Sequence, residues 1–258
     1  MGDELLWASD IAIKGADLAL SFYSPDKMET RAKGQRDIVT AADVAVERFV
    51  RESLRKRFPA DDVVGEEGGG DDSGGCRRWY VDPVDGTFNY SRGIPVWCLS
   101  LALFEARQPV LGAIRDPLRG EIFVAARGRG AKCNGATLAA TSQLDLSRAV
   151  VHMTVDFDDE SMNVGLDDLR RLQPKVLRTR NLGSVALALA YVAAGRLDAV
   201  LHRFAHTWDF GAGVALILET GGCVTAIDGS PYREGSTSVL AAGNGELHAA
   251  LLHALRSH

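Results

Sequence analysis

The chain has 258 residues, of which 46% are hydrophobic and 24% are charged, and its formal net charge is −5 at pH 7. This length allows either one large hydrophobic core or two smaller cores packed together. The net negative charge argues against a surface for nucleic acid or anionic membranes, because such surfaces carry clustered Lys and Arg. There is no transmembrane run, and the chain starts without an export or lipidation signal, so we expect a cytoplasmic protein.

The spacing of the cysteines argues against a zinc site and against a disulfide framework. They lie far apart in the sequence, and no two of them have the Cys-x-x-Cys spacing of a zinc site. A disulfide framework is also not expected in a chain of this kind. We therefore expect reduced thiols in the core, at Cys76, Cys98, Cys133 and Cys223.

Two helices and a set of strands are predicted in the first half. Apolar side chains recur with a helical period over residues 4–22, and Ser24-Pro25 stops the pattern. Thr40 is suited to cap a second helix that ends before Pro59. Short apolar runs separated by turn residues follow the Gly/Asp-rich loop and are typical of antiparallel strands. These runs lie at residues 78–81, 96–104, 109–115 and 121–126, and a further short apolar strand, at residues 63–65, precedes the loop.

From about residue 147, strand-like and helix-like segments alternate, which indicates a second, α/β layer. The predicted strands lie at residues 149–155, 176–182, 198–202 and 223–227. The predicted helices lie at residues 159–172 and 184–194, and a third begins at Asp209. We therefore predict an N-terminal α+β subdomain with the metal-binding motifs, residues 1–146, and a C-terminal α/β subdomain, residues 147–258.

The most informative motif is Asp-Pro-Val-Asp-Gly-Thr at residues 82–87, which follows a predicted strand. The proline fixes its own φ, and a tight turn there lets Asp82 and Asp85 converge. Two close carboxylates repel each other unless a cation lies between them. Hard oxygen ligands select Mg²⁺, and the Val84 carbonyl is a further candidate ligand. The alternative is an ordinary surface turn, in which Asp, Pro and Gly are common.

Two further acidic residues follow other predicted elements. Glu66 comes directly after the short strand at residues 63–65, and Asp209 follows Trp208 at the start of a helix. A Glu at the first position can complete a metal shell, whereas Asp209 alone reads equally well as a helix cap. Asp37 and Asp43 likewise read as capping and surface residues when taken alone. Gly86 and Thr87 open the next segment, where their N–H groups are suited to hold a phosphate.

Three segments of the chain form a recognisable set: Gly65-Glu66-Glu67, the motif at residues 82–87, and Trp208-Asp209-Phe210-Gly211-Ala212-Gly213. Together they resemble the three signatures of the inositol monophosphatase family, in the same order and at similar separations. The resemblance covers roughly residues 5–250. Supporting matches are Lys33 with residues 37–43, Gly128-Arg129-Gly130-Ala131 with Asn134-Gly135, Gly183-Ser184, and Glu219-x-Gly-Gly.

The resemblance implies the architecture and the class of activity. The implied fold is a layered α-β-α-β-α sandwich, α+β in its first half and α/β in its second. The first half would supply an antiparallel sheet, and the latter half would supply a second, mixed sheet. The implied activity is that of a Mg²⁺-dependent, lithium-sensitive phosphoric monoester hydrolase acting on a small phosphorylated metabolite. A homodimer is also implied.

The resemblance further implies which residues bind the metals. Glu66, Asp82 and the Val84 carbonyl would hold a first Mg²⁺. A second Mg²⁺ would be held by Asp82, Asp85 and Asp209, so that Asp82 bridges the two ions. A more weakly held third Mg²⁺ is implied near Glu66 and Asp43.

Roles in the reaction are implied in the same way. Glu66 and Thr87 would orient the water that attacks phosphorus, and Asp82 would hold both metals during the reaction. The backbone of Gly86 and Thr87 would stabilise charge on the phosphoryl oxygens. Contacts to phosphate or substrate are expected from a wider set, namely Gly86, Thr87, Asp85, Gly183, Ser184, Val185, His202 and Arg203.

The chain departs from the family at the position that reads the substrate. A Glu seven residues before the Trp-Asp aspartate contacts inositol hydroxyls in the family, and here that residue is His202. His202 is either a reader of a different sugar or imidazole group, or a partly buried strand residue. Arg203 either contacts a second anionic group or points into solvent, and the two side chains should face opposite sides of a strand.

Several functions therefore stay open. Inositol 1-phosphate and related sugar phosphates are the first candidates, because Phe88 stands where related nucleotide and histidinol phosphatases commonly carry Lys. Histidinol phosphate and fructose 1,6-bisphosphate are alternatives. A different class is also possible, since some family members act mainly as binding partners of RNA or transcription machinery.

Overall fold

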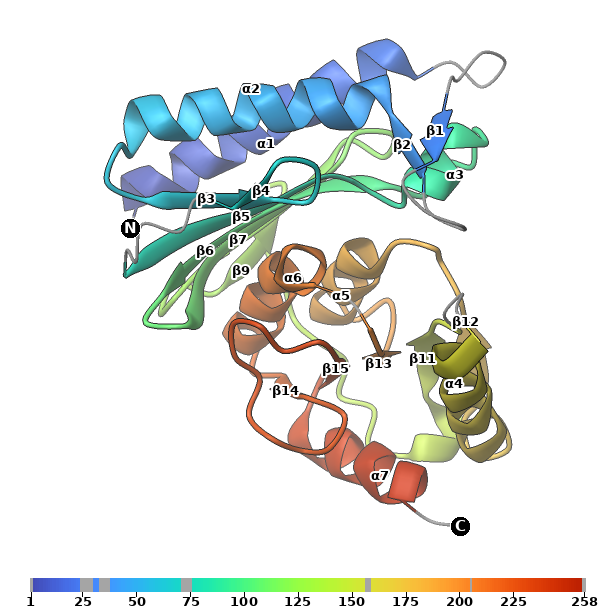
Figure 1. The fold of residues 1–258 in the computed structure, drawn as a ribbon. Helices are drawn as coiled ribbons and strands as arrows, with labels where there is room; N and C mark the ends of the chain where they lie inside the picture. The colour runs from blue at the N-terminus through green and yellow to red at the C-terminus, as the bar shows by residue number, and fades with distance from the viewer. Residues whose placement is uncertain are drawn as a thin grey trace.

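The chain forms five stacked layers in the order α-β-α-β-α, which confirms the predicted fold class (Figure 1). The computed structural model describes residues 2–23, 30–32, 38–70, 76–155, 159–204 and 206–256. Helices α1 and α2 cover one face of the first sheet, α5 and α6 lie between the two sheets, and α4 and α7 form the last layer. The helices are α1 (Gly2–Phe22), α2 (Ala41–Arg57), α3 (Thr87–Ser91), α4 (Asp159–Leu172), α5 (Val185–Ala193), α6 (Thr207–Glu219) and α7 (Gly245–Arg256).

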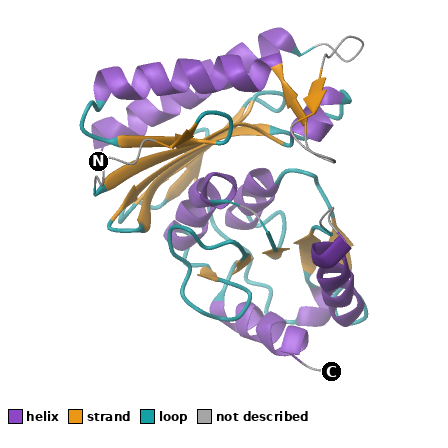
Figure 2. Ribbon diagram, viewed as in Figure 1, coloured by secondary structure: helices purple, strands orange, loops and turns teal. Residues whose placement is uncertain are grey.

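The first sheet has eight strands in the order β10-β9-β8-β7-β6-β5-β3-β4. Figure 2 shows this sheet directly beneath the two long N-terminal helices. Every neighbouring pair is antiparallel except β3 with β5, which is parallel. A separate antiparallel pair, β1 (Thr30–Ala32) with β2 (Ile38–Thr40), precedes α2. The sheet strands are β3 (Asp62–Gly65), β4 (Gly69–Gly70), β5 (Arg77–Asp85), β6 (Cys98–Glu105), β7 (Gln108–Asp116), β8 (Glu121–Ala126), β9 (Ala131–Cys133) and β10 (Ala136–Thr137).

The second sheet has five strands in the order β12-β11-β13-β15-β14 and is mixed, as predicted. Strands β12, β11 and β13 are parallel, whereas β13, β15 and β14 pair antiparallel. The predicted boundary after residue 146 falls in a short 3-10 helix, Leu146–Arg148, which separates the strands of the first sheet from those of the second along the sequence. The division into two subdomains stays a prediction. The strands are β11 (Val150–Met153), β12 (Arg178–Arg180), β13 (Ala199–His202), β14 (Cys223–Thr225) and β15 (Val239–Ala242).

The predicted elements are all present, with a few differences at their ends. The helix expected to begin at Asp209 begins earlier, at Thr207. Strand β5 does not stop before Asp82 but continues to Asp85. The elements that were not predicted are β1, β2, β4, β9, β10, β15, α3 and α7. Most of them are very short, and β15 is a four-residue apolar run without the alternation that marks a half-buried strand.

The cysteines are free, as expected, but they do not all lie in the core. All four cysteines are free, and Cys98 is buried in the core. Cys133 and Cys223 are only half-buried and Cys76 is exposed, so the expectation of four core thiols is wrong for Cys76. It lies in the bend directly before β5. Among the helices that the structure describes, none is both long enough and apolar enough to cross a bilayer.

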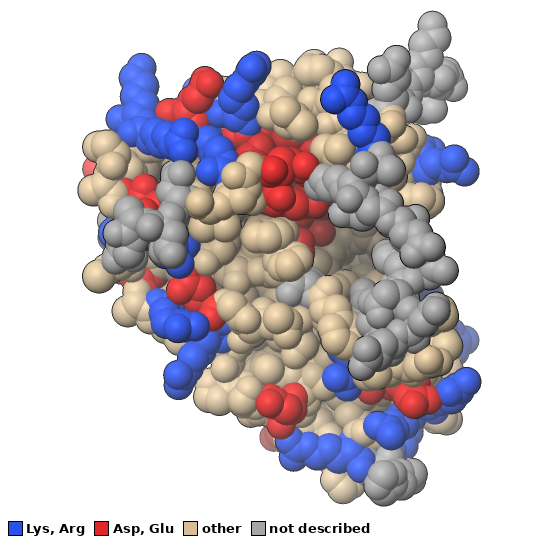
Figure 3. All heavy atoms as spheres, in the orientation of Figure 1, with Lys and Arg blue, Asp and Glu red and all other residues tan. Residues whose placement is uncertain are grey.

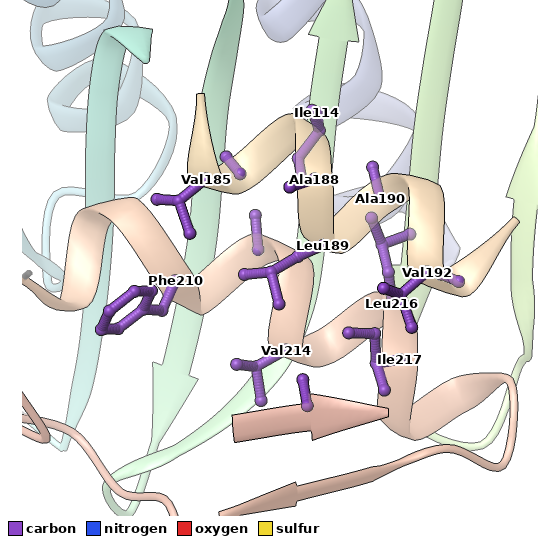
Figure 4. Close-up of a cluster of buried hydrophobic side chains, with 14 of the residues drawn as sticks. Ile114, Val185, Ala188, Leu189, Ala190, Val192, Phe210, Val214, Leu216 and Ile217 are labelled. Carbon is purple, nitrogen blue, oxygen red and sulfur yellow. The ribbon is translucent and has the colours of Figure 1, made fainter. Parts of the chain in front are cut away.

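The middle layer joins the two halves of the chain. All residues of α5 except Tyr191 are buried, because this helix has sheets on both sides. The side chains of α5 and α6 pack together and onto the first sheet, which contributes Ile114 (Figure 4). Phe104 and Phe123 of the same sheet belong to this core cluster. A helix that is apolar all round is expected in such a buried position.

Close approach of α6 to the first sheet depends on glycine. A Cβ atom at Gly112, in β7, would overlap the backbone carbonyl group of Ala212 in α6. A Cβ at Gly213 would overlap the side chain of Leu189 in α5. Backbone atoms cannot move aside as a flexible side chain can, so Gly112 is the more restrictive of the two positions.

Gly112→Ala is therefore expected to destabilise the protein by about 3 kcal/mol, within the range of overpacking in a close-packed core. For a chain of this size the melting temperature would fall by roughly 6–12 °C. Gly245→Ala is the matched control, because a Cβ there meets no atom within 4 Å. Thermal unfolding of both variants measures the effect, and equal melting temperatures would contradict the packing argument.

Candidate active site

Three carboxylates meet at the end of the first sheet. One oxygen each of Asp82, Asp85 and Asp209 lies within 4.8 Å of the others, although Asp209 is far away in the sequence. Asp82 and Asp85 are only 2% and 6% exposed, so the alternative of a surface turn at this motif is wrong. Figure 3 shows acidic side chains gathered in the middle of one face, beside a hollow of the surface.

A β-bulge places Asp82 and Asp85 on the same face of β5. Asp82 lies opposite Ser100 and Asp85 lies opposite Cys98, so three steps along β5 match two steps along β6. Residues three apart in a regular strand would face opposite sides, whereas the extra residue of a bulge restores the same side. Pro83 has no N–H to donate to the ladder and is therefore tolerated inside the bulge.

Asp85 is held by the N-terminus of α5. Its carboxylate accepts hydrogen bonds from the hydroxyl of Ser184 and from the N–H groups of Val185, at 3.3 Å, and Ala186, at 2.9 Å. The positive end of a helix stabilises such a negative charge. Burial nevertheless outweighs these bonds and raises the pKa of Asp85 to about 6. Ser184 and Val185, which were expected near the substrate, thus lie against a carboxylate.

The other two carboxylates are held less firmly. Asp82 accepts a hydrogen bond from the Val84 N–H at 3.0 Å. Asp209 accepts one from the His206 N–H at 2.6 Å, so it caps α6 and also belongs to the cluster. Burial raises the pKa of both groups well above the ordinary value, and the negative charges of Glu66 and the neighbouring aspartates raise it further.

Asp43 lies near the cluster and contacts Thr87. Its carboxylate accepts hydrogen bonds from the N–H, at 2.9 Å, and from the hydroxyl of Thr40, which caps α2. The Thr87 hydroxyl lies 3.3 Å from Asp43 Oδ1 and 3.1 Å from the Val84 carbonyl oxygen. Asp43 is fully buried, so the capping interpretation is confirmed and the surface interpretation is wrong. Asp37, like Lys33, falls outside the described residues.

Gly86 connects β5 to α3 at a point where only glycine fits. Its φ is +97°, and a Cβ atom would lie 3.0 Å from the carbonyl oxygens of both Gly183 and Val96. Asn89 holds the same junction, because its amide donates to the carbonyls of Val96, at 2.8 Å, and Leu182, at 2.7 Å. The first residues of α3 are therefore fixed against the loop that precedes α5.

Glu66 is the first residue of the turn that joins β3 to β4. Its N–H donates to the Val81 carbonyl at 3.2 Å, which extends the parallel pairing of β3 with β5 and places Glu66 beside Asp82. The turn also contacts Glu47, a buried residue of α2 that the sequence reasoning missed. The available signal was helical spacing, since Glu47 lies one turn after Asp43 on the same helix face.

His202 and Arg203 point to different layers, as predicted. The ring of His202 packs edge-on against Phe210 of α6, with centroids 5.7 Å apart. Burial lowers the pKa of His202 to about 4, so the imidazole is neutral near pH 7. The guanidinium of Arg203 instead forms a bidentate ion pair with Asp168 of α4, in the last layer, and does not point freely into solvent.

Comparison with known proteins gives a consistent result. The sequence matches the family model described as "Inositol monophosphatase family" over residues 3–258. An inositol-1-monophosphatase of Bacillus subtilis is 33% identical over 236 residues, which cover 91% of this chain and 89% of that protein. The Nus factor SuhB of Escherichia coli is 32% identical over 243 residues, covering 93% and 90%. The solved structure of the extragenic suppressor protein suhB from Bartonella henselae has a TM-score of 0.93 at 30% identity, with 99% of each chain covered.

The buried cluster leads to a stability prediction for the metal-free protein. Because the pKa of Asp82 is raised in the folded state, its ionised form destabilises the fold at pH 7.5, and Asp82→Asn removes that charge. We expect a melting temperature a few degrees above wild type in EDTA, since about 1 kcal/mol corresponds to roughly 2–4 °C. Excess Mg²⁺ should raise the melting temperature of wild type but not of the variant.

Asp116→Asn is the matched control. Asp116 is also fully buried, but it is compensated by an ion pair with Arg119 at 2.9 Å and by two backbone N–H groups. Removing its charge should therefore lower the melting temperature in EDTA. A lower melting temperature of Asp82→Asn than of wild type in EDTA would show that repulsion among the carboxylates does not destabilise the fold.

Proposed function

Because this chain belongs to the inositol monophosphatase family, we propose that it is a metal-dependent phosphomonoesterase that hydrolyses a small phosphorylated metabolite. The observation that supports this proposal most directly is the convergence of Asp82, Asp85 and Asp209. Three clustered carboxylates with raised pKa values, two of them buried and Asp209 half-buried, are costly to maintain unless a cation compensates them.

The donor set fits Mg²⁺, since it consists of oxygen atoms only. We assign Glu66, Asp82 and the Val84 carbonyl to one ion, and Asp82 with Asp85 and Asp209 to a second. A weaker third ion is assigned near Glu66, with support from Asp43. When bound, Mg²⁺ would lower the pKa of a water molecule and neutralise charge on the phosphoryl group.

The protein's own groups would orient the reactants. The Thr87 hydroxyl donates its proton to either Asp43 or the Val84 carbonyl, which leaves its oxygen free to accept a hydrogen bond from the attacking water. Glu66 would accept a second hydrogen bond from that water. The N–H groups of Gly86 and Thr87 would bind phosphoryl oxygens, with Gly86 allowing close approach.

The proposed substrate is a small phosphate monoester. Inositol 1-phosphate or a related sugar phosphate is our first choice, with histidinol phosphate and fructose 1,6-bisphosphate as alternatives. His202 would contact the substrate as a neutral donor or acceptor, and the loop of Gly183, Ser184 and Val185 would border it. Arg203 would contribute only if it left Asp168. We also propose inhibition by Li⁺, a homodimer and a cytoplasmic location.

A binding role is the second candidate. It is supported by the relatives that are named Nus factor SuhB, at 32% identity over most of the chain. In that case the protein would act mainly as a partner of RNA or transcription machinery. The metal-site variant Asp82→Asn separates the two, because a phenotype that survives this change cannot depend on phosphatase activity.

The proposed activity should depend on Mg²⁺ and on Asp82. Wild type should hydrolyse phosphate monoesters with millimolar-range Mg²⁺, on the order typical of ions that keep several waters. Asp82→Asn should lower the single-turnover rate about a thousandfold or more, and Asp209→Asn should lower it less, because Asp82 is assigned to both ions. Full activity in excess EDTA would refute the metal mechanism.

Substrate preference should respond to His202. A carboxylate accepts two hydrogen bonds from neighbouring hydroxyls, whereas a neutral imidazole accepts one. His202→Glu should therefore raise kcat/KM for inositol 1-phosphate, relative to a simple phosphate monoester, by about tenfold if one hydrogen bond is gained. The Mg²⁺ dependence should not change. If all substrates decline together, His202 is a packing residue.

A further inference from the structure

A buried carboxylate outside the acidic cluster holds the turn that carries Glu66. Glu47, in α2, is 3% exposed, and its two oxygens accept hydrogen bonds from the N–H groups of Glu67 and Gly68, each at 2.7 Å. These N–H groups belong to the two residues that follow Glu66 in the turn. The carboxylate therefore binds the turn through the backbone and does not compete with the Glu66 side chain.

Arg51 completes the contact one helical turn later. Its Nε donates to Glu47 Oε1 at 2.8 Å, which compensates the buried negative charge. The same guanidinium donates to the carbonyl of Val63, at 3.1 Å, and to that of Gly69, which flank the turn on its two strands. From α2, Glu47 and Arg51 together therefore hydrogen-bond to β3, to the turn and to β4.

Two glycines in the hairpin make room for the Glu47 carboxylate. A Cβ atom at Gly65 would overlap the Glu47 carboxylate, and one at Gly68 would lie 2.7 Å from its Oε1. Both positions are glycine, so the carboxylate can lie directly against the backbone on either side of Glu66. The position of the Glu66 backbone is in this way fixed from α2 as well as from β5.

We propose that Glu47 and Arg51 are positioning residues, which hold the β3–β4 turn so that the Glu66 carboxylate is preorganised to bind a metal ion. This inference rests on the proposed function, because it takes Glu66 as a metal ligand. Residues that orient a ligand typically change metal affinity 10–100-fold when they are removed. Their contribution should appear in metal binding and should act only through Glu66.

The test measures Mg²⁺ affinity of the full chain by isothermal titration calorimetry after removal of metal with EDTA. Glu47→Gln keeps the size of the side chain but replaces one acceptor oxygen by an NH₂ group, so one backbone N–H loses its partner. We expect Mg²⁺ binding to weaken about tenfold or more. In a Glu66→Gln background, Glu47→Gln should not weaken Mg²⁺ binding any further, because the ligand that Glu47 positions is already lost.

Glu219→Gln is the matched control for a loss of fold stability alone. Glu219, at the end of α6, accepts hydrogen bonds from the N–H groups of Gly128, at 2.9 Å, and of Arg129 and Gly130, and this loop carries no proposed ligand. Both variants should lower the melting temperature in EDTA. Only Glu47→Gln should change the Mg²⁺ affinity.

Two results would overturn the inference. One is a Mg²⁺ affinity of Glu47→Gln that is no weaker than that of Glu219→Gln, and the other is an equal loss in the Glu66→Gln background. If Glu47→Gln does not fold, Arg51→Lys decides, because it keeps the charge but loses the fork that reaches Val63 and Gly69; unchanged affinity would again contradict the proposal. Wild type that binds Mg²⁺ but hydrolyses no phosphate monoester would refute the proposed function and leave this comparison valid.

Discussion

The mutual repulsion of three clustered carboxylates, two of them buried, is the constraint on which the rest of the structure depends. Asp82, Asp85 and Asp209 share a space in which no described Lys or Arg is paired with them. Each is held by a different device: a bulge in β5, the N-terminus of α5, and the first turn of α6. The fold therefore concentrates negative charge through backbone geometry and helix ends, which carry partial charges without side-chain cations.

The layered architecture explains how these devices meet. Helices α5 and α6 lie between the two sheets, and the N-termini of both helices carry or contact a cluster residue. The close contact at Gly112 fixes α6 against β7, and the contact of Gly86 with Gly183 fixes α3 against the loop before α5. The site thus lies where the middle layer begins, and its precision derives from the packing of that layer.

Local patterns in the sequence were sufficient for most helices, for most of the longer strands and for the acidic residues of the site. The roles of single residues were harder to predict when their partners lie far away in the chain. The strand containing Asp82 and Asp85 reads as a turn, because a bulge is visible only against its partner β6. The hydrogen bond of Ser184 to Asp85, across 99 positions, could not be predicted from the local sequence either. Glu47 carried no motif at all, since its partners are backbone N–H groups of another element.

The separation of the cluster residues along the chain has a consequence for folding. Asp85 and its partner Ser184 belong to opposite halves, and Asp209 follows later still, so the site exists only after the long-range contacts of α5 and α6 have formed. Closing such large loops costs conformational entropy, and a partly folded chain has not yet formed the contacts that close them. A cation bound by all three carboxylates would recognise only the completed native state, and by mass action it would deplete unfolded and half-folded chains. The same charges that disfavour folding of the bare polypeptide would then make the ion a selective stabiliser of chains in which both halves are assembled.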